Sequence, residues 1–281
     1  MNFALLSSVA APKVKADPVR CKALLGAANN GDVTEVEDLI KRPDADVDVN
    51  FFDDEWTALL KASFKGYQRV VRILADHPDV DVNKPDNEGY TPLYVAGQKG
   101  HADCVGLLLA HPQIEVNKAK NTGATPLFIS GQNGHADCVG LLLAHPQIEV
   151  NKDTNDGATP LHAAGENGHA DCVSLLLAHP QIKVNRATNT GDTPLFMSCQ
   201  KGHTDSVGLL LAHPQIEVNK ARNDGVTPLM VASYVGHLEV VKQLLNDPNI
   251  DVNVRDEDWN TALDWAKRKG HTEVANAIRR F

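Results

Sequence analysis

The sequence repeats itself with a period of 34 residues, and this regularity constrains the fold more than any other feature. Residues 121–154 read NTGATPLFISGQNGHADCVGLLLAHPQIEVNKDT, and residues 155–188 are identical to them at 25 of 34 positions. Self-similarity at a fixed period of this size is typical of supersecondary units that bury their apolar faces against their neighbours. The sequence therefore predicts an elongated stack of units without a single central core.

The same register extends over most of the chain. The tripeptides Thr-Pro-Leu or Thr-Ala-Leu begin at Thr57, Thr91, Thr125, Thr159, Thr193, Thr227 and Thr261. A degenerate unit without this tripeptide precedes them, from about Pro18 to Asn50. We therefore expect one array of about eight units over residues 18–281. Its first and last units should act as caps, because their outer faces meet water instead of a neighbour.

Residues 1–17 precede the array. The stretch 3–11 is mildly apolar, but no lysine or arginine comes before it. A secretory signal usually has a charged start and a longer apolar core, so we do not expect export. We interpret residues 1–17 as a tail or as part of the N-terminal cap.

Composition and charge restrict the classes of partner. Hydrophobic residues make up 42% of the chain and charged residues 22%, which is typical of a folded protein. The net charge of −9 disfavours nucleic acid as a partner, because surfaces that bind a phosphate backbone are basic. No apolar run approaches the roughly 18 residues of a membrane span. We expect a monomeric protein in the cytoplasm, with the nucleus as the alternative.

The five cysteines indicate thiols and not a disulfide framework, since their number is odd. They are Cys21, Cys104, Cys138, Cys172 and Cys199. Three of them occupy one register of successive units, and packed helices lie roughly 8–10 Å apart. A disulfide requires Cα atoms within roughly 7 Å, so we expect reduced, buried thiols.

One unit predicts two short helices and a loop. Thr91 can cap a helix that begins at Pro92 and ends before Gly100. A second helix should begin near Ala102 and end before the His-Pro pair at 111–112, because a residue before proline disfavours the α region. The remainder alternates apolar and polar residues and contains Asn-Thr-Gly at 121–123, which favours an extended loop or hairpin. Tetratricopeptide repeats share the period, but their two longer helices leave little room for such a loop.

The order Gly-x-Thr-Pro-Leu, a small residue, Gly-His, Leu-Leu-Leu and Val-Asn resembles the ankyrin repeat over about residues 18–281. The resemblance implies an all-α solenoid of helix-turn-helix units joined by β-hairpin-like loops. Two departures affect local geometry. Each unit has one extra residue in its His-Pro-Gln-Ile segment, and the histidine that usually follows Thr-Pro-Leu survives only as His162.

Internal copies separate constant positions from variable ones. The string GHADCVGLLLAHPQIEVN occurs unchanged at 100–117 and at 134–151. Variation collects at the residue before each threonine and at the pair before each helix-ending glycine. In the ankyrin family, which the chain resembles, these positions line the concave groove that contacts partner proteins. The candidate partner-binding residues are Trp56, Phe64, Lys65, Tyr90, Gln98, Lys99, Gln132, Asn133, Glu166, Asn167, Asp192, Gln200, Lys201, Val226, Tyr234 and Arg268.

Two alternatives to partner binding stay open for these positions. Exposed substitutions usually cost little, so the differences between units can also be neutral. Trp and Tyr are enriched in binding hot spots, yet Trp56, Phe64, Tyr90 and Tyr234 would also serve as aromatic lids over the ends of the array.

Catalytic and metal sites are disfavoured. The histidines of the Gly-His motif recur once per unit, roughly 8–10 Å apart, which is too far for bonds of roughly 2 Å to one zinc ion. Cys104 becomes Ser206 and Val240 in later units, as a packing residue would. The acidic stretch 44–50 partly mimics a calcium loop, but Val49 occupies the position that requires glycine.

We expect a non-enzymatic scaffold that binds a partner protein in the concave groove, without a cofactor or metal. A structural spacer, or an element that self-assembles through an end repeat, is the alternative.

Overall fold

The structure is a computed structural model that describes residues 16–41, 46–53 and 56–281, and this part of the chain contains 16 helices and no strand. The helices are α1 (Pro18–Asn30), α2 (Val33–Ile40), α3 (Ala58–Lys65), α4 (Gln68–Ala75), α5 (Pro92–Lys99), α6 (Ala102–Leu109), α7 (Pro126–Gln132), α8 (Ala136–Leu143), α9 (Pro160–Glu166), α10 (Ala170–Leu177), α11 (Pro194–Lys201), α12 (Thr204–Leu211), α13 (Pro228–Val235), α14 (Leu238–Leu245), α15 (Ala262–Lys269) and α16 (Thr272–Arg280). Residues 1–15 lie outside the described part, so the predicted tail stays a prediction.

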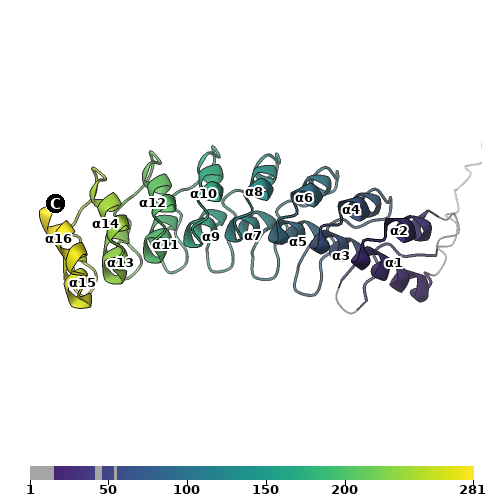
Figure 1. The fold of residues 1–281 in the computed structure, drawn as a ribbon, viewed down its shortest axis with the longest axis horizontal. Helices are drawn as coiled ribbons and strands as arrows, with labels where there is room; N and C mark the ends of the chain where they lie inside the picture. Colours follow the sequence, from purple (N-terminus) through teal and green to yellow (C-terminus); the bar gives the residue numbers. More distant parts are fainter. Residues whose placement is uncertain (1–15, 42–45, 54–55) are drawn as a thin grey trace, which may run out of the picture.

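The helices form two layers along a gently curved stack (Figure 1). Each odd-numbered helix packs against the odd-numbered helices of the neighbouring units and against the even-numbered helix of its own unit. The even-numbered helices pack against one another in the same way. The odd-numbered layer and the long loops lie on the inner, concave side of the curve (Figure 1). The predicted solenoid of helix-turn-helix units is therefore confirmed.

Local chemistry sets the ends of the helices as the sequence predicts. The hydroxyl of Thr91 accepts a hydrogen bond from the backbone N–H of Tyr94 at 3.1 Å, and Pro92 occupies the first turn. Gly100 ends α5 with φ of 75°, a left-handed conformation that favours glycine. The next unit repeats this arrangement with Thr125 and Pro126.

The core runs between the two layers along the whole stack. In α8, Cys138, Val139 and Leu142 are completely buried, and the equivalent residues of the neighbouring units are as well. All five cysteines are free and buried, as expected. Because each unit buries its apolar residues against the next, no unit has a closed core of its own.

A histidine ladder ties each unit to the one before it. Each histidine of the Gly-His motif places Nε2 about 3 Å from a backbone carbonyl oxygen 37 residues earlier, so that His135 reaches Gln98 at 3.1 Å and His203 reaches Glu166 at 2.9 Å. The rungs are His101, His135, His169, His203, His237 and His271. These histidines thus satisfy carbonyl groups near the C-terminal ends of the preceding odd-numbered helices.

An asparagine ladder joins the outer loops. Asn117 donates through Nδ2 to the carbonyl oxygen of Gln147 at 2.6 Å and accepts from the backbone N–H of Glu149 at 2.9 Å. The same pair of bonds recurs from Asn50, Asn83, Asn151, Asn185 and Asn219. The invariant Val-Asn of the repeat therefore stacks one loop on the next.

The long loops are hairpin-like without forming a ladder of strands. Lys120 and Ala124 share a backbone hydrogen bond of 3.0 Å, and the N–H of Gly123 donates to the carbonyl oxygen of Lys120 at 2.8 Å. Gly123 has φ of 86° in this turn. In the described residues the sole bridge of strand type joins Asp53 and Trp56.

Candidate functional site

Two hollows lie on the concave side, between the long loops and the odd-numbered helices. One has a volume of about 640 Å³ and lies at the centre of the stack, with Gln98, Phe128 and Gln132 among its lining residues. The other has a volume of about 380 Å³, lies near the C-terminal end, and is lined by Gln200 and Tyr234 among others. We refer to them as the central hollow and the C-terminal hollow, and to the surface that joins them as the groove.

The structure brings part of the predicted set to these hollows. Gln98 and Gln132 line the central hollow, while Gln200, Val226 and Tyr234 line the C-terminal one. At the ends of the odd-numbered helices or just after them, Lys65, Lys99, Asn133, Asn167, Lys201 and Arg268 are exposed. Glu166 and Asp192 are half-buried. The predicted residues therefore share one face, and their role in binding stays a prediction.

The aromatic residues near the N-terminal end pack against one another. The rings of Trp56 and Phe64 meet edge to face with centroids 5.0 Å apart, and Tyr90 meets Tyr94 in the same way at 5.2 Å. The indole N–H of Trp56 donates to a carboxylate oxygen of Asp86 at 3.1 Å. All of them are partly or fully buried in a small apolar cluster. This packing agrees with the aromatic-lid alternative for Trp56, Phe64 and Tyr90.

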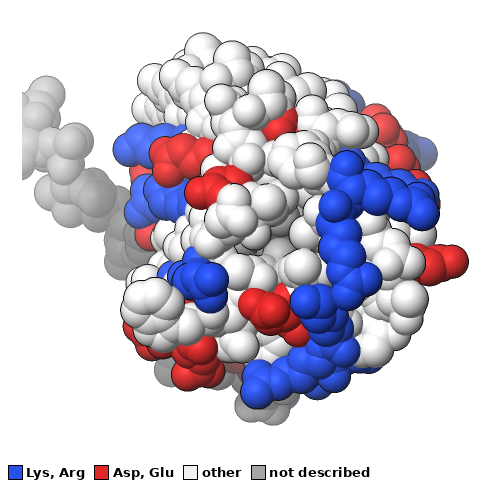
Figure 2. All heavy atoms as spheres, turned by 90° about the vertical axis from the view of Figure 1, so that its left-hand side faces the viewer, with Lys and Arg blue, Asp and Glu red and all other residues white. Residues whose placement is uncertain are grey.

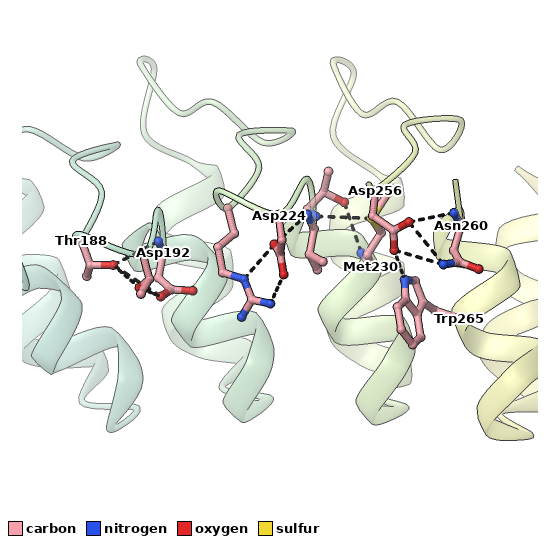
Figure 3. Close-up of polar contacts among 11 residues, drawn as sticks. Thr188, Asp192, Asp224, Met230, Asp256, Asn260 and Trp265 are labelled. Atoms are coloured by element: carbon pink, nitrogen blue, oxygen red, sulfur yellow. Dashed lines mark hydrogen bonds and ion pairs between the residues drawn. The ribbon is translucent and has the colours of Figure 1, made fainter. Parts of the chain in front are cut away.

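The C-terminal hollow has a similar aromatic pair, but one of its rings is more exposed than those near the N-terminal end. The rings of Tyr234 and Trp265 meet edge to face at 5.2 Å, and 41% of Tyr234 is exposed. The indole N–H of Trp265 donates to Oδ2 of Asp256 at 2.8 Å, and the backbone N–H of Asn260 donates to Oδ1 at 2.8 Å (Figure 3). Asp256 is 8% exposed, so these bonds fix a buried carboxylate between the loop and α15.

A second carboxylate on the neighbouring loop is paired. Asp224 makes two hydrogen bonds with Arg222 through Nε and Nη2, of which the first is 2.9 Å long (Figure 3). The hydrogen bond from Arg222 lowers the pKa of Asp224, and Asp224 in turn raises the pKa of Arg222. The guanidinium group of Arg222 also lies over the ring of Phe196, 5.4 Å from its centroid. Arg222 is therefore held by contacts within the hollow.

Several buried titratable groups with shifted pKa values serve packing. Burial raises the pKa of the thiols of Cys104, Cys138 and Cys172 to about 11, which makes them poor nucleophiles near neutral pH. Burial lowers the pKa of His162 to about 4. Nδ1 of His162 accepts from the backbone N–H of Thr159 at 3.0 Å, and Nε2 lies 2.9 Å from the carbonyl oxygen of Asp192. His162 therefore caps α9 and binds the next unit as a neutral imidazole.

The metal-type residues do not converge. Within residues 16–41, 46–53 and 56–281, no three side chains of His, Cys, Asp or Glu are placed to share a metal ion. The second histidine series stabilises the turn that follows each even-numbered helix, since Nδ1 of His111 accepts from the backbone N–H of Gln113 at 3.2 Å. Residues 44 and 45 of the calcium-like stretch lie outside the described part.

No helix of the described part has the length and apolar character that crossing a bilayer requires.

Sequence reasoning missed most of the wall of the C-terminal hollow. Phe196, Met230, Trp265, Arg222, Asp224, Asp256, Glu257 and Asp258 line it, and none was a candidate. Phe196 and Met230 occupy the position after Thr-Pro-Leu, whose variation was visible but assigned to local geometry. Glu257 and Asp258 lie at a loop tip, where the five preceding units carry Asn, then Asp, Thr or Glu, and then Gly. Comparison of loop tips between units marks this loop and residues 53–55 as the two most acidic tips, with three acidic residues each.

Comparison with known proteins adds a family. A family model described as ankyrin repeats (3 copies) matches residues 24–120, 114–188, 182–256 and 220–279. Among solved structures, the crystal structure of EF0377, an ankyrin repeat protein, is similar with a TM-score of 0.63 and 25% sequence identity. That match covers 67% of this chain and 96% of the other. Because the family model spans most of the sequence and the fold agrees, the chain belongs to the ankyrin repeat family.

Proposed function

We propose that this protein binds a partner protein through the groove formed by its odd-numbered helices and long loops. Ankyrin repeats are in general modules of protein–protein interaction. One observation supports the groove in particular: several residues that line its two hollows, such as Tyr94, Phe128 and Met230 at one register, differ between units, while the histidine and asparagine ladders that join the units recur unchanged. Side chains that stacking does not require are free to be chosen for a partner.

The composition of the groove favours a polar, reversible interface. Three glutamines, Gln98, Gln132 and Gln200, line the hollows from α5, α7 and α11, and no backbone group depends on their side chains for a hydrogen bond in the described residues. Interfaces of obligate complexes are more apolar than this. Buried thiols without disulfides support a cytoplasmic or nuclear location for the complex.

Affinity capture with matched variants tests the groove. A triple Gln98→Ala, Gln132→Ala, Gln200→Ala variant should lose the captured partner. The control is a second triple variant in which the exposed glutamines of the outer loops, Gln147, Gln181 and Gln215, are replaced by alanine. These outer loops lie on the opposite side of the stack (Figure 1), so the control should retain the partner. Equal capture by both variants, at matched circular dichroism, would remove the groove from the proposal.

A further inference from the structure

The C-terminal hollow combines an aromatic wall with an acidic one. Phe196, Tyr234 and Trp265 lie on the helices α11, α13 and α15, while Asp224, Glu257 and Asp258 lie on two loops opposite. The loops are joined, because the backbone N–H of Glu257 donates to the carbonyl oxygen of Asp224 at 3.2 Å. A backbone hydrogen bond thus joins the two acidic loops, and the contact between the rings of Tyr234 and Trp265 holds the aromatic wall.

The charges of the lining residues do not cancel. Four carboxylates line the hollow, those of Asp224, Asp256, Glu257 and Asp258, against the one guanidinium group of Arg222. Asp224 neutralises that guanidinium, and the donors to Asp256 are the uncharged groups of Trp265 and Asn260. Glu257 and Asp258 are exposed, and neither forms an ion pair within the described residues.

From this arrangement we propose that the hollow receives an arginine or lysine side chain of the partner protein. The apolar stem of such a side chain would lie on Tyr234 and Trp265, and its charged end would face Glu257 and Asp258. Aromatic faces attract cations, and the attraction grows when water is excluded. A volume of about 380 Å³ accommodates one long side chain with its backbone at the rim. This inference rests on the proposed function of the groove and names the chemistry of its partner.

The chain's own cations show that the same rings bind positive charge. Nζ of Lys269 lies 4.2 Å from the centroid of Tyr234, and the guanidinium carbon of Arg268 lies 5.5 Å from that of Trp265. Both residues belong to the last turn of α15 and do not line the hollow. Figure 2, an end-on view of the C-terminal side, shows one continuous band of basic side chains, and separate acidic patches, some beside further basic side chains, away from it. The incoming cation must therefore approach from the loop side, where the carboxylates lie.

The central hollow shows that the acidic excess is local. Its charged lining residues are Lys120 and Asp156, one of each sign. Nζ of Lys120 lies 4.7 Å from the ring centroid of Tyr90 and 3.1 Å from its hydroxyl oxygen. The two hollows thus share their position between loops and helices but differ in charge. Hence only the C-terminal one should prefer a cationic side chain.

A pair of peptides tests the preference. The probe is acetyl-Gly-Gly-Arg-Gly-Gly-amide, and its neutral control carries citrulline in place of arginine. Binding is followed in ¹H–¹⁵N spectra at the indole N–H of Trp265. The indole of Trp56 is an internal control, since it also donates to a loop aspartate but lies at the other end of the stack. We expect a saturable shift at Trp265 with the arginine peptide alone.

Charge variants complete the test. A Glu257→Gln, Asp258→Asn variant should weaken binding of the arginine peptide about fivefold, the upper end for exposed charge pairs. A Glu35→Gln, Asp38→Asn variant removes the same charge from exposed positions of α2 and should leave binding unchanged. Equal affinity for the citrulline peptide, equal shifts at Trp56, or equal losses in both variants would overturn the inference. If the peptide tests fail while affinity capture of the partner still depends on the groove glutamines, the preference for arginine or lysine is refuted and the proposed function stands.

Discussion

Glycines inside the odd-numbered helices allow a sharp test of how the units stack. Glycine in a helix interior lowers stability by up to about 1 kcal/mol relative to alanine, so the presence of Gly97 and Gly131 inside helices calls for an explanation from packing. A Cβ atom at Gly97 would lie 2.6 Å from Oγ of Ser130 in the next unit. A Cβ atom at Gly131 would meet its nearest neighbours at 3.4 Å and 3.8 Å, the second being Cβ of Ala164. Only the first of these is a clash.

The magnitude follows from what Ser130 would lose. Its hydroxyl donates to the carbonyl oxygen of Pro126 at 2.8 Å, and the residue is completely buried. To admit a methyl group at position 97, the hydroxyl must leave this acceptor, and a buried unsatisfied hydroxyl costs about 1–3 kcal/mol. Gly97→Ala should therefore be neutral to about 2 kcal/mol destabilising once the helix gain is subtracted. Gly131→Ala should stabilise the protein by about 0.5–1 kcal/mol.

A double-mutant cycle isolates the contact. With Ser130→Ala in place, the new methyl at position 97 would face a Cβ atom at 4.0 Å, close to the spacing of 3.8 Å that Gly131 has with Ala164. Gly97→Ala should then stabilise the Ser130→Ala protein, with a coupling of at least about 1 kcal/mol. Urea unfolding followed by circular dichroism and by tryptophan fluorescence measures it, provided that the two transitions coincide. A stabilising Gly97→Ala in the wild type, or no coupling to Ser130, would refute the reasoning.

Three further predictions concern stability. Folding lowers the pKa of His162 from 6.5 to about 4, so the unfolded chain binds the proton first, and the free energy of unfolding should fall as pH drops from about 6.5 towards 4. The His162→Phe variant, which carries the residue of neighbouring units, should reduce this loss of at most roughly 3 kcal/mol, as measured by urea titrations at several pH values. Leu142→Ala should cost about 2–5 kcal/mol in the same assay, because Leu142 is completely buried between units. Gly100→Ala should cost clearly more than Gly270→Ala: both glycines have positive φ, but a Cβ atom at Gly100 would lie 2.6 Å from a ring atom of His135, whereas nothing lies within 4 Å at Gly270.

The units of this fold could be predicted in detail because their signals are local. Thr91, Pro92 and Gly100 determine where α5 begins and ends through capping, a fixed φ and a left-handed turn, and each effect acts within a few residues. The period then fixed the neighbours of every unit. Burial of Cys104 followed from its register.

What could not be predicted depends on contacts across units. The motif shows that His135 recurs, but not that its ring reaches the carbonyl oxygen of Gln98, because many carbonyl groups lie within a side chain's length. The C-terminal hollow depends on Trp265 reaching Asp256 from another element. Such a pair has no periodic signal, since a single unit carries it. The candidate binding site is therefore defined by side chains that occur in one unit only, and a search for periodic patterns does not detect them.

Stacking nevertheless leaves a trace in pairs of positions. Gly97, Gly131 and Gly165 each lie against the residue of the next unit at the register of Ser130. Read in that order, the pairs are Ser63 with Ala96, Gly97 with Ser130, Gly131 with Ala164, Gly165 with Ser198, Cys199 with Ala232, and Ser233 with Ala266. In each of these pairs at least one member is glycine or alanine, as close packing between neighbouring helices requires. At groove positions such as Gln98, by contrast, a long side chain is followed one unit later by another long one. Positions where a change in one unit is matched by a change in the size of its neighbour therefore serve stacking. Positions such as that of Gln98, where no such matching occurs, are available for contact with a partner.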